Sequence, residues 1–170
     1  RSAVNTMASA NAICDQLEDP KTAKGLLKRG VTRVVTPSTY VENETDPSSP
    51  SLLGLAWTGK VWGLALLEPA TGLFQFWEEP ADTLADTLDR IAPSEIVTTK
   101  SMAASPLLTV SCVQRPEIVV TRLDDWQASD EESLTCIQTF FGLDSLRALE
   151  MSPATTSAVA LVLRFLQGHM

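Results

Sequence analysis

Few residues in this chain could form a metal site or a disulfide framework. The 170 residues include three cysteines, Cys14, Cys112 and Cys136, without a CxxC pair, and one histidine, His169. Structural zinc needs closely spaced Cys and His ligands, and a disulfide framework normally uses an even number of cysteines. The sequence therefore predicts no metal site and no disulfide, and it indicates reduced thiols in a cytoplasmic protein.

Long apolar runs are also missing. The longest, residues 158–166, is interrupted by Arg164, whereas a membrane-spanning helix needs about 20 predominantly apolar residues. We interpret this run as a buried helix. Residues 1–12 lack the continuous apolar core of a signal peptide. We therefore expect no membrane partner.

Positive charge is scarce. The chain has 13 Lys and Arg against 21 Asp and Glu, a formal net charge of −8 at pH 7. Proteins that bind duplex nucleic acid take much of their affinity from Lys and Arg that neutralise phosphates. The basic residues gather only near the start of the chain, at Lys21, Lys24, Lys28, Arg29 and Arg33. This cluster favours a solvated surface on a connecting segment, and the alternative is a patch that contacts a phosphate backbone.

The apolar residues, 44% of the chain, suffice for a core. They recur in short runs that predict strands at residues 12–17, 31–36, 52–58, 61–67, 73–78, 95–99 and 117–121. Gly59 and the segment 69–72 supply hairpin turns between the third, fourth and fifth of these runs. The third and fourth runs are apolar on both faces, which predicts helices on both sides of the sheet. Residues 42–51, rich in Pro, Ser and acids, are interpreted as a linker.

Helix signals follow the strands. One helix is predicted from Pro80 to Pro93 and a short turn or helix at 101–107. Ser129 and Glu132 predict a capping box for a helix that ends at Gly142. The apolar face of that helix is predicted to consist of Leu134, Ile137 and Phe141. Ser152 and Pro153 predict the start of the last helix, and its apolar face is Ala158, Leu161, Val162, Phe165 and Leu166.

This order predicts an α/β fold of the ribonuclease-H-like type. An antiparallel three-stranded meander followed by βαβ crossovers gives a mixed five-stranded sheet with helices on both faces. Nucleases of this fold need converging carboxylates for Mg²⁺, one of them in the middle of the first strand. The strand at 52–58 has no acid, and we interpret the remaining candidates, Glu68, Glu95, Asp124 and Asp125, as turn and helix-end residues.

Other catalytic patterns are absent from the sequence. The chain has no GxxxxGK[ST] loop and no GxSxG elbow. The strand runs that hold the aromatic residues Trp57, Trp62, Phe74, Phe76 and Trp77 contain no Lys or Arg, which favours core over base stacking. The sequence thus predicts no catalytic, cofactor-binding or metal-binding residue. A divalent-metal nuclease that depends on Glu68 or Glu95 stays open as the alternative function.

Residues 13–39 carry a specific resemblance. The segment from Cys14 reads CDQLEDPKTAKGLLKRGVTRVVTPST. It resembles the pattern ICEQ-x-x-DP-x-x-x-KG…R-x-V-x-R-x-x-TPGT of the bacterial MutS family of DNA mismatch repair proteins. The matching positions are Ile13, Cys14, Gln16, Asp19, Pro20, Lys24, Gly25, Arg29, Val31, Arg33, Thr36, Pro37 and Thr39, and Ser38 replaces a glycine. The strand pair around Gly63 and Gly72 and the run from Pro93 to Ile96 are similar to the family as well.

The resemblance implies a division at residue 38. Residues 1–38 would be the tail of the mismatch-binding domain with its entry segment, and 39–170 the connector domain, MutS domain II. It implies a non-catalytic connector that links mismatch recognition to the ATPase domains and contributes to MutL docking. The full-length family protein would be a homodimer that uses ATP and Mg²⁺ and binds mismatched duplex DNA, whereas this fragment would hold no cofactor. A structural spacer without an external partner is the third interpretation.

Overall fold

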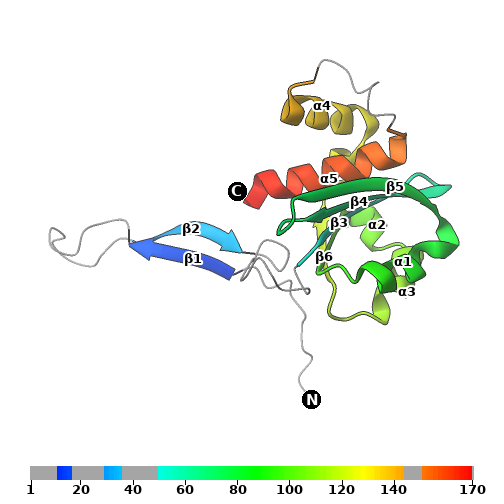
Figure 1. The fold of residues 1–170 in the computed structure, drawn as a ribbon, viewed down its shortest axis with the longest axis horizontal. Helices are drawn as coiled ribbons and strands as arrows, with labels where there is room; N and C mark the ends of the chain where they lie inside the picture. Colours follow the sequence, from blue (N-terminus) through cyan, green and yellow to red (C-terminus); the bar gives the residue numbers. More distant parts are fainter. Residues whose placement is uncertain (1–10, 17–28, 36–49, 144–150, 170) are drawn as a thin grey trace.

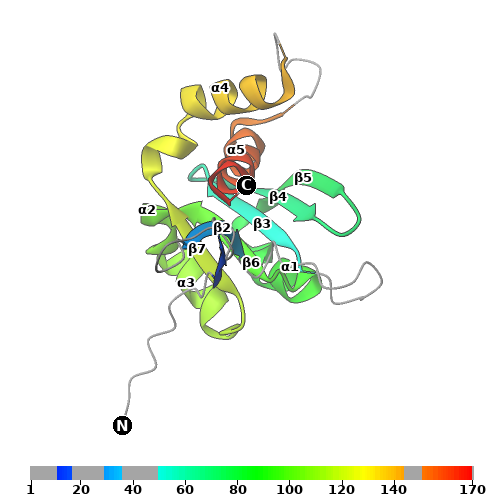
Figure 2. The ribbon, with the colours of Figure 1, turned by 90° about the vertical axis from the view of Figure 1, so that its left-hand side faces the viewer.

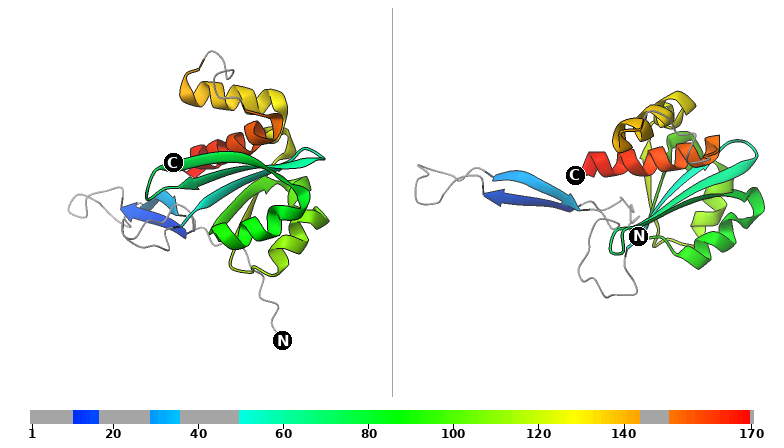
Figure 3. Two further views of the ribbon diagram at one scale, coloured as in Figure 1. Left: turned by 45° about the vertical axis from the view of Figure 1, so that its right-hand side comes forward. Right: turned by 45° about the horizontal axis from the view of Figure 1, so that its top comes forward.

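The structure, a computed structural model, describes residues 11–16, 29–35, 50–143 and 151–169 (Figure 1). Strands β1 (Asn11–Gln16) and β2 (Arg29–Val35) pair antiparallel in a two-stranded sheet of their own (Figure 3). Both predicted strands are confirmed within two residues. Arg29 and Gly30 belong to β2 and not to a loop. The rest of the predicted loop at 21–30 and most of the predicted linker at 42–51 lie outside the described residues.

The main sheet has five strands in the order β5-β4-β3-β6-β7. Their bounds are β3 Leu52–Trp57, β4 Val61–Glu68, β5 Leu73–Pro80, β6 Glu95–Thr99 and β7 Val119–Leu123. Strand β4 is antiparallel to both β3 and β5, while β6 is parallel to both β3 and β7. These strand directions confirm the predicted meander followed by parallel crossovers. A parallel connection requires a crossover segment, and the helices between β5, β6 and β7 provide it.

Helices cover both faces of this sheet, as predicted. The helical elements are η1 Ala81–Thr83, α1 Leu84–Ile91, α2 Lys100–Ala103, α3 Pro106–Val113, η2 Asp125–Ala128, α4 Asp130–Phe141 and α5 Pro153–His169. Figures 1 and 2 show α5 along one face with α4 lying over it, and α1, α2 and α3 on the other face.

Strand alternation divides the core into two parts. Leu53 and Leu55 of β3 and Trp62 of β4 are fully buried on the side of α1 and α3. Leu52 and Ala65 are buried on the opposite side, under α5. Side chains of successive strand residues point to opposite faces, so a strand that is apolar at every position serves both cores.

Two glycines allow α5 to lie close to the sheet. A Cβ at Gly54 would come within 2.6 Å of Val162 Cγ2, and a Cβ at Gly63 within 2.8 Å of Thr155 N. In both cases the added atom would also contact the α5 backbone, at Ala158 O or Ala154 O. Because glycine has no side chain at these two positions, the backbone of α5 can lie directly against the backbone of β3 and β4. This contact sets the distance between the helix and the sheet.

The predicted helix ends around α5 and α4 are confirmed. Ser152 precedes α5, its Oγ accepts a hydrogen bond from Thr155 N at 3.3 Å, and Pro153 is the first helical residue. Gly142 ends α4 with a φ of 63°, a left-handed conformation that costs glycine little. The apolar face predicted for α5 is buried apart from Leu166, which is partly exposed.

Three other predictions differ in detail from the structure. Ser129 is the N-cap of α4 but makes no side-chain capping bond, so the predicted capping box with Glu132 does not form. Residues 101–107 fall into α2 and α3 instead of one short element; Ser105 Oγ caps α3 by accepting from Leu107 N at 3.4 Å. Strand β7 begins two residues later than predicted, since Ile118 N donates to Arg115 O in a turn before it.

The start of the first helix is also shifted. Pro80 is the last residue of β5 and precedes η1, and the α-helical part begins only at Leu84. Ala92 ends α1 with a φ of 46°, just before the proline that was predicted to end the run. A residue that precedes proline is disfavoured in the right-handed helical region, which accounts for this end.

Candidate interaction surface

The carboxylates of the nuclease hypothesis do not converge. Leu52 of β3 pairs with Leu67 of β4 on one side and with Glu95 of β6 on the other. Glu95 therefore shares the α5 face with Leu67, whereas the next residue, Glu68, points to the opposite face. Glu95 is 1% exposed and accepts a hydrogen bond from Thr121 Oγ1 at 2.6 Å. Within the described part of the chain, no three His, Cys, Asp or Glu side chains are grouped so that they could hold a metal.

Asp124 and Asp125 lie at the other end of the sheet, after β7. Lys100 Nζ lies 2.5 Å from Asp124 Oδ1, and this hydrogen bond with the attraction of the carboxylate raises the pKa of Lys100. Ser101 Oγ and its backbone N–H both donate to Asp125 Oδ1, at 2.5 and 3.1 Å, and they lower the pKa of Asp125. These two acids thus join the end of β7 to the start of α2, a structural role consistent with the prediction that they are helix-end residues.

The five aromatic residues of the meander do not form one stacking row. By strand alternation, Trp57, Trp62 and Trp77 face the side of α1 while Phe74 and Phe76 face the side of α5. Trp62 is 0% exposed, and its ring centroid is 4.8 Å from that of Trp57. The core prediction is confirmed for Trp62. Phe76, 36% exposed, is at the surface of β5.

Helix α4 packs on α5 through a face different from the predicted one. Ser133, Cys136 and Ile137 are its buried residues. Of the predicted face, Ile137 is buried, while Leu134 is 42% and Phe141 48% exposed. Burial of the Cys136 thiol raises its pKa.

An ion pair fixes the first turn of α4 to α5. Arg164 Nη2 lies 2.8 Å from Glu132 Oε2 and also donates to Glu132 O at 3.2 Å. The same guanidinium lies 5.4 Å above the ring centroid of Trp126 in η2, within the range of a cation–π contact. Ser157 Oγ adds a hydrogen bond to Ala128 O at 3.0 Å. Helix α4 is therefore held in a defined orientation on α5.

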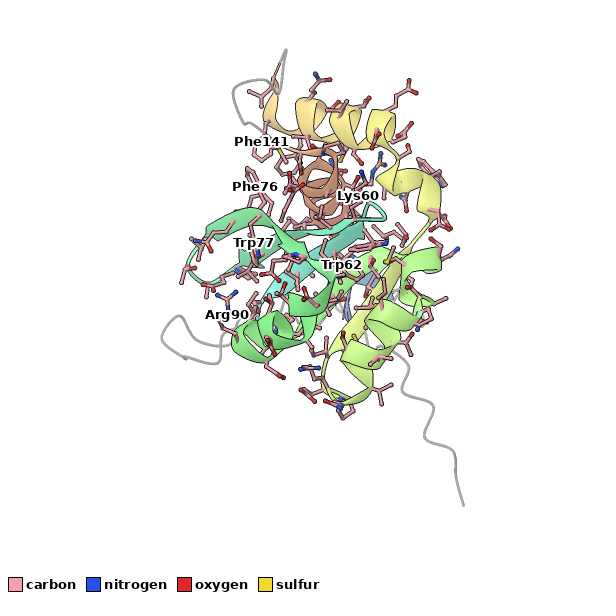
Figure 4. All side chains as sticks on the ribbon, turned by 90° about the vertical axis from the view of Figure 1, so that its right-hand side faces the viewer. Lys60, Trp62, Phe76, Trp77, Arg90 and Phe141 are labelled. Carbon is pink, nitrogen blue, oxygen red and sulfur yellow. The ribbon has the colours of Figure 1, made fainter. Side chains whose placement is uncertain are left out.

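Four apolar residues in and just after α4 are exposed at the surface. Leu134, Phe140, Phe141 and Leu143 are exposed by 42%, 40%, 48% and 37% respectively. The rings of Phe140 and Phe141 form an edge-to-face pair with centroids 5.0 Å apart, and Figure 4 shows Phe141 at the end of the helix. We call these four residues the α4 surface. Grouped exposed apolar residues commonly mark an interaction site.

Comparison with known proteins identifies the family. Residues 50–169 match the family model for MutS domain II, and residues 2–44 match the model for MutS domain I. The chain belongs to the MutS family. A DNA mismatch repair protein MutS from Methanococcoides burtonii is 33% identical over 162 residues, 91% of this chain and 18% of that protein. The MutS of Symbiobacterium thermophilum is 44% identical over 104 residues, 58% of this chain and 12% of that protein.

The chain thus spans less than a fifth of the length of these MutS relatives. The structure describes two strands of the part that matches MutS domain I, and the domain II match covers the five-stranded sheet and its helices. Of the predicted basic cluster, Arg29 and Arg33 belong to β2, and Lys21, Lys24 and Lys28 lie outside the described residues. The division at residue 38 stays a prediction.

Cys112 and Cys136 are free thiols, and burial raises the pKa of both. In the described ranges, none of the helices is both long enough and apolar enough to span a membrane. The cytoplasmic location, and the expectation that this part of a MutS protein has no cofactor or metal, stay predictions.

Proposed function

We propose that this part of a MutS protein is a non-catalytic connector that couples mismatch recognition to the ATPase domains and takes part in docking MutL. The observation that carries the proposal is the α4 surface, with three exposed apolar residues on α4 and a fourth just after it. The Arg164–Glu132 ion pair holds this helix on α5. A rigid helix with exposed aromatic residues suits a protein partner, because such residues dominate binding energy at interfaces.

The charge of the chain supports a protein partner over direct DNA binding. A net charge of −8 repels a phosphate backbone at long range. In this proposal, mismatched duplex DNA is bound only by the full-length protein, which acts as a homodimer with ATP and Mg²⁺ in domains beyond this chain. The connector contributes packing contacts to the other MutS domains and one surface to MutL.

The test is a titration of the purified chain with the N-terminal region of its cognate MutL, followed by calorimetry and by NMR of the labelled chain. We expect saturable binding, with shifts centred on the α4 surface. Phe141→Asp should weaken binding by about tenfold or more, since loss of one central aromatic contact commonly costs at least that much.

The matched control is Val113→Asp, which places the same charge at a 72% exposed apolar position of α3 on the opposite face of the sheet. Its affinity for MutL should equal that of the parent chain, and both variants should keep the parent unfolding temperature. Equal weakening by both variants would contradict the assignment to α4. Absence of binding at high concentration would support the spacer interpretation instead.

A further inference from the structure

Strand β5 is a long edge of the main sheet. It has eight residues, and among the described strands only β4 pairs with it, at the margin visible in Figure 2. The opposite edge, β7, has five residues. An edge strand carries backbone N–H and C=O groups that can pair with a further strand. Addition of an extended peptide to such an edge is a common mode of recognition.

A surface pocket adjoins this edge. It has a volume of about 250 Å³ and is lined by Phe76, Trp77 and Glu78 of β5 and by Ser152 and Thr155 at the start of α5. Phe76 and Glu78 face the α5 side because they oppose Ala65 and Gly63 of β4. Figure 4 shows Phe76 on the side of α4 and α5, while Trp77 lies toward α1. A side chain of an added strand could therefore enter the pocket beside Phe76.

The charge of the edge selects between possible occupants. Glu78 is exposed beside the pocket. The neighbouring Glu79 is engaged internally, since it accepts from Trp77 Nε1 and Thr87 Oγ1, each at 2.8 Å. Pairing of β5 with β5 of a second copy would bring two acidic edges together, and like charges on adjacent strands are unfavourable. A basic strand would instead place a cation near Glu78.

We propose that β5 binds an extended basic peptide segment of a partner protein by strand addition. The segment carries a large apolar residue opposite Phe76 and a Lys or Arg two positions away, opposite Glu78. The two-residue spacing follows from strand geometry, in which alternate side chains share a face. This site is independent of the α4 surface and of the proposed MutL docking, so either can fail without the other.

The probe is a capped nine-residue peptide of Thr and Val with one Leu and one Lys two positions apart. Binding to the labelled chain is followed by NMR shifts and by hydrogen exchange of the β5 amides. We expect saturable shifts centred on residues 73–79 and slower exchange there. Glu78→Lys should weaken binding roughly three- to fivefold at low salt, as expected for an exposed ion pair. A peptide with Glu in place of Lys should then bind the variant better than the parent.

Two controls separate strand addition from other binding. Glu117→Lys makes the same charge change at an exposed residue near the opposite edge and should leave affinity unchanged. Two further peptides carry N-methyl groups at odd or at even positions. Because only alternate N–H groups of an added strand face its neighbour, one methylated peptide should lose binding and the other should keep it.

Three results would overturn the proposal. The first is no saturable binding at millimolar peptide. The second is equal binding by both methylated peptides, which would indicate contacts through side chains alone. The third is a set of shifts centred away from β5, for example on α4, which would place the peptide on a different surface.

Discussion

Replacing Gly63 by alanine would test how closely α5 lies on the sheet. The new Cβ would come within 2.8 Å of Thr155 N and would also contact Ala154 O, all of it backbone. Neither β4 in the middle of the sheet nor α5 beneath α4 can shift without disturbing its other contacts. Overpacking of this kind costs about 1–3 kcal/mol. The smaller entropy of the unfolded chain offsets about 0.4–1 kcal/mol of that cost.

Because the contacts are with backbone, the cost should lie in the upper half of that range, so the net loss is about 1–2.6 kcal/mol and should lower Tm by roughly 2–10 °C. The assay is reversible thermal or urea unfolding of the whole chain. Gly168→Ala is the matched control, since its added Cβ would have no atom within 4 Å. It should be neutral or slightly stabilising because alanine favours a helix. A Gly63→Ala variant as stable as the parent would show that α5 is not held at this distance, and the reasoning on close packing would be wrong.

Two further predictions concern polar contacts. Arg115 is 7% exposed, and its guanidinium Nε lies 2.8 Å from Asp89 Oδ1. Arg115→Ala should therefore lower the free energy of unfolding, measured with urea, by about 2 kcal/mol. The control Arg122→Ala, at an exposed position, should change this free energy little. The pKa of Asp125 is lowered by Ser101, so its contribution to stability is complete above its ordinary pKa of 3.8 and is lost as the pH falls through the lower folded value. Ser101→Ala should remove that contribution, and unfolding curves of the parent and the variant should converge as the pH falls below 3.8; a constant difference at all pH values would refute this cause.

Local signals predicted the hairpins and the start of α5 well. Gly59 and Gly72 take positive φ values of 89° and 70° at the two turns of the meander, as their positions between apolar runs indicated. Ser152 and Pro153 begin α5 as expected. These features depend on one or two residues and their neighbours, and such information is contained in the sequence itself.

Helix α3 shows where local sequence signals are insufficient. Its start carries a clear signal, with Ser105 as cap and Pro106 at the first position. Its length was missed because apolar residues occur on every side of the helix, so Val110 and Val113 are exposed while Leu108 is buried. A helix without an apolar periodicity has no face that the sequence can identify.

The sequence by itself determined the strand and helix order, the mixed sheet with two covered faces and the resemblance to the MutS family. Tertiary structure decided which apolar residues are core. On α4 the periodicity placed Leu134, Ile137 and Phe141 on one face, but Ser133 and Cys136 turn toward α5 with Ile137 and leave the others exposed. Periodicity reports which residues share a side of a helix. What packs against that side depends on residues distant in the chain, such as the glycines of β3 and β4 that bring α5 onto the sheet.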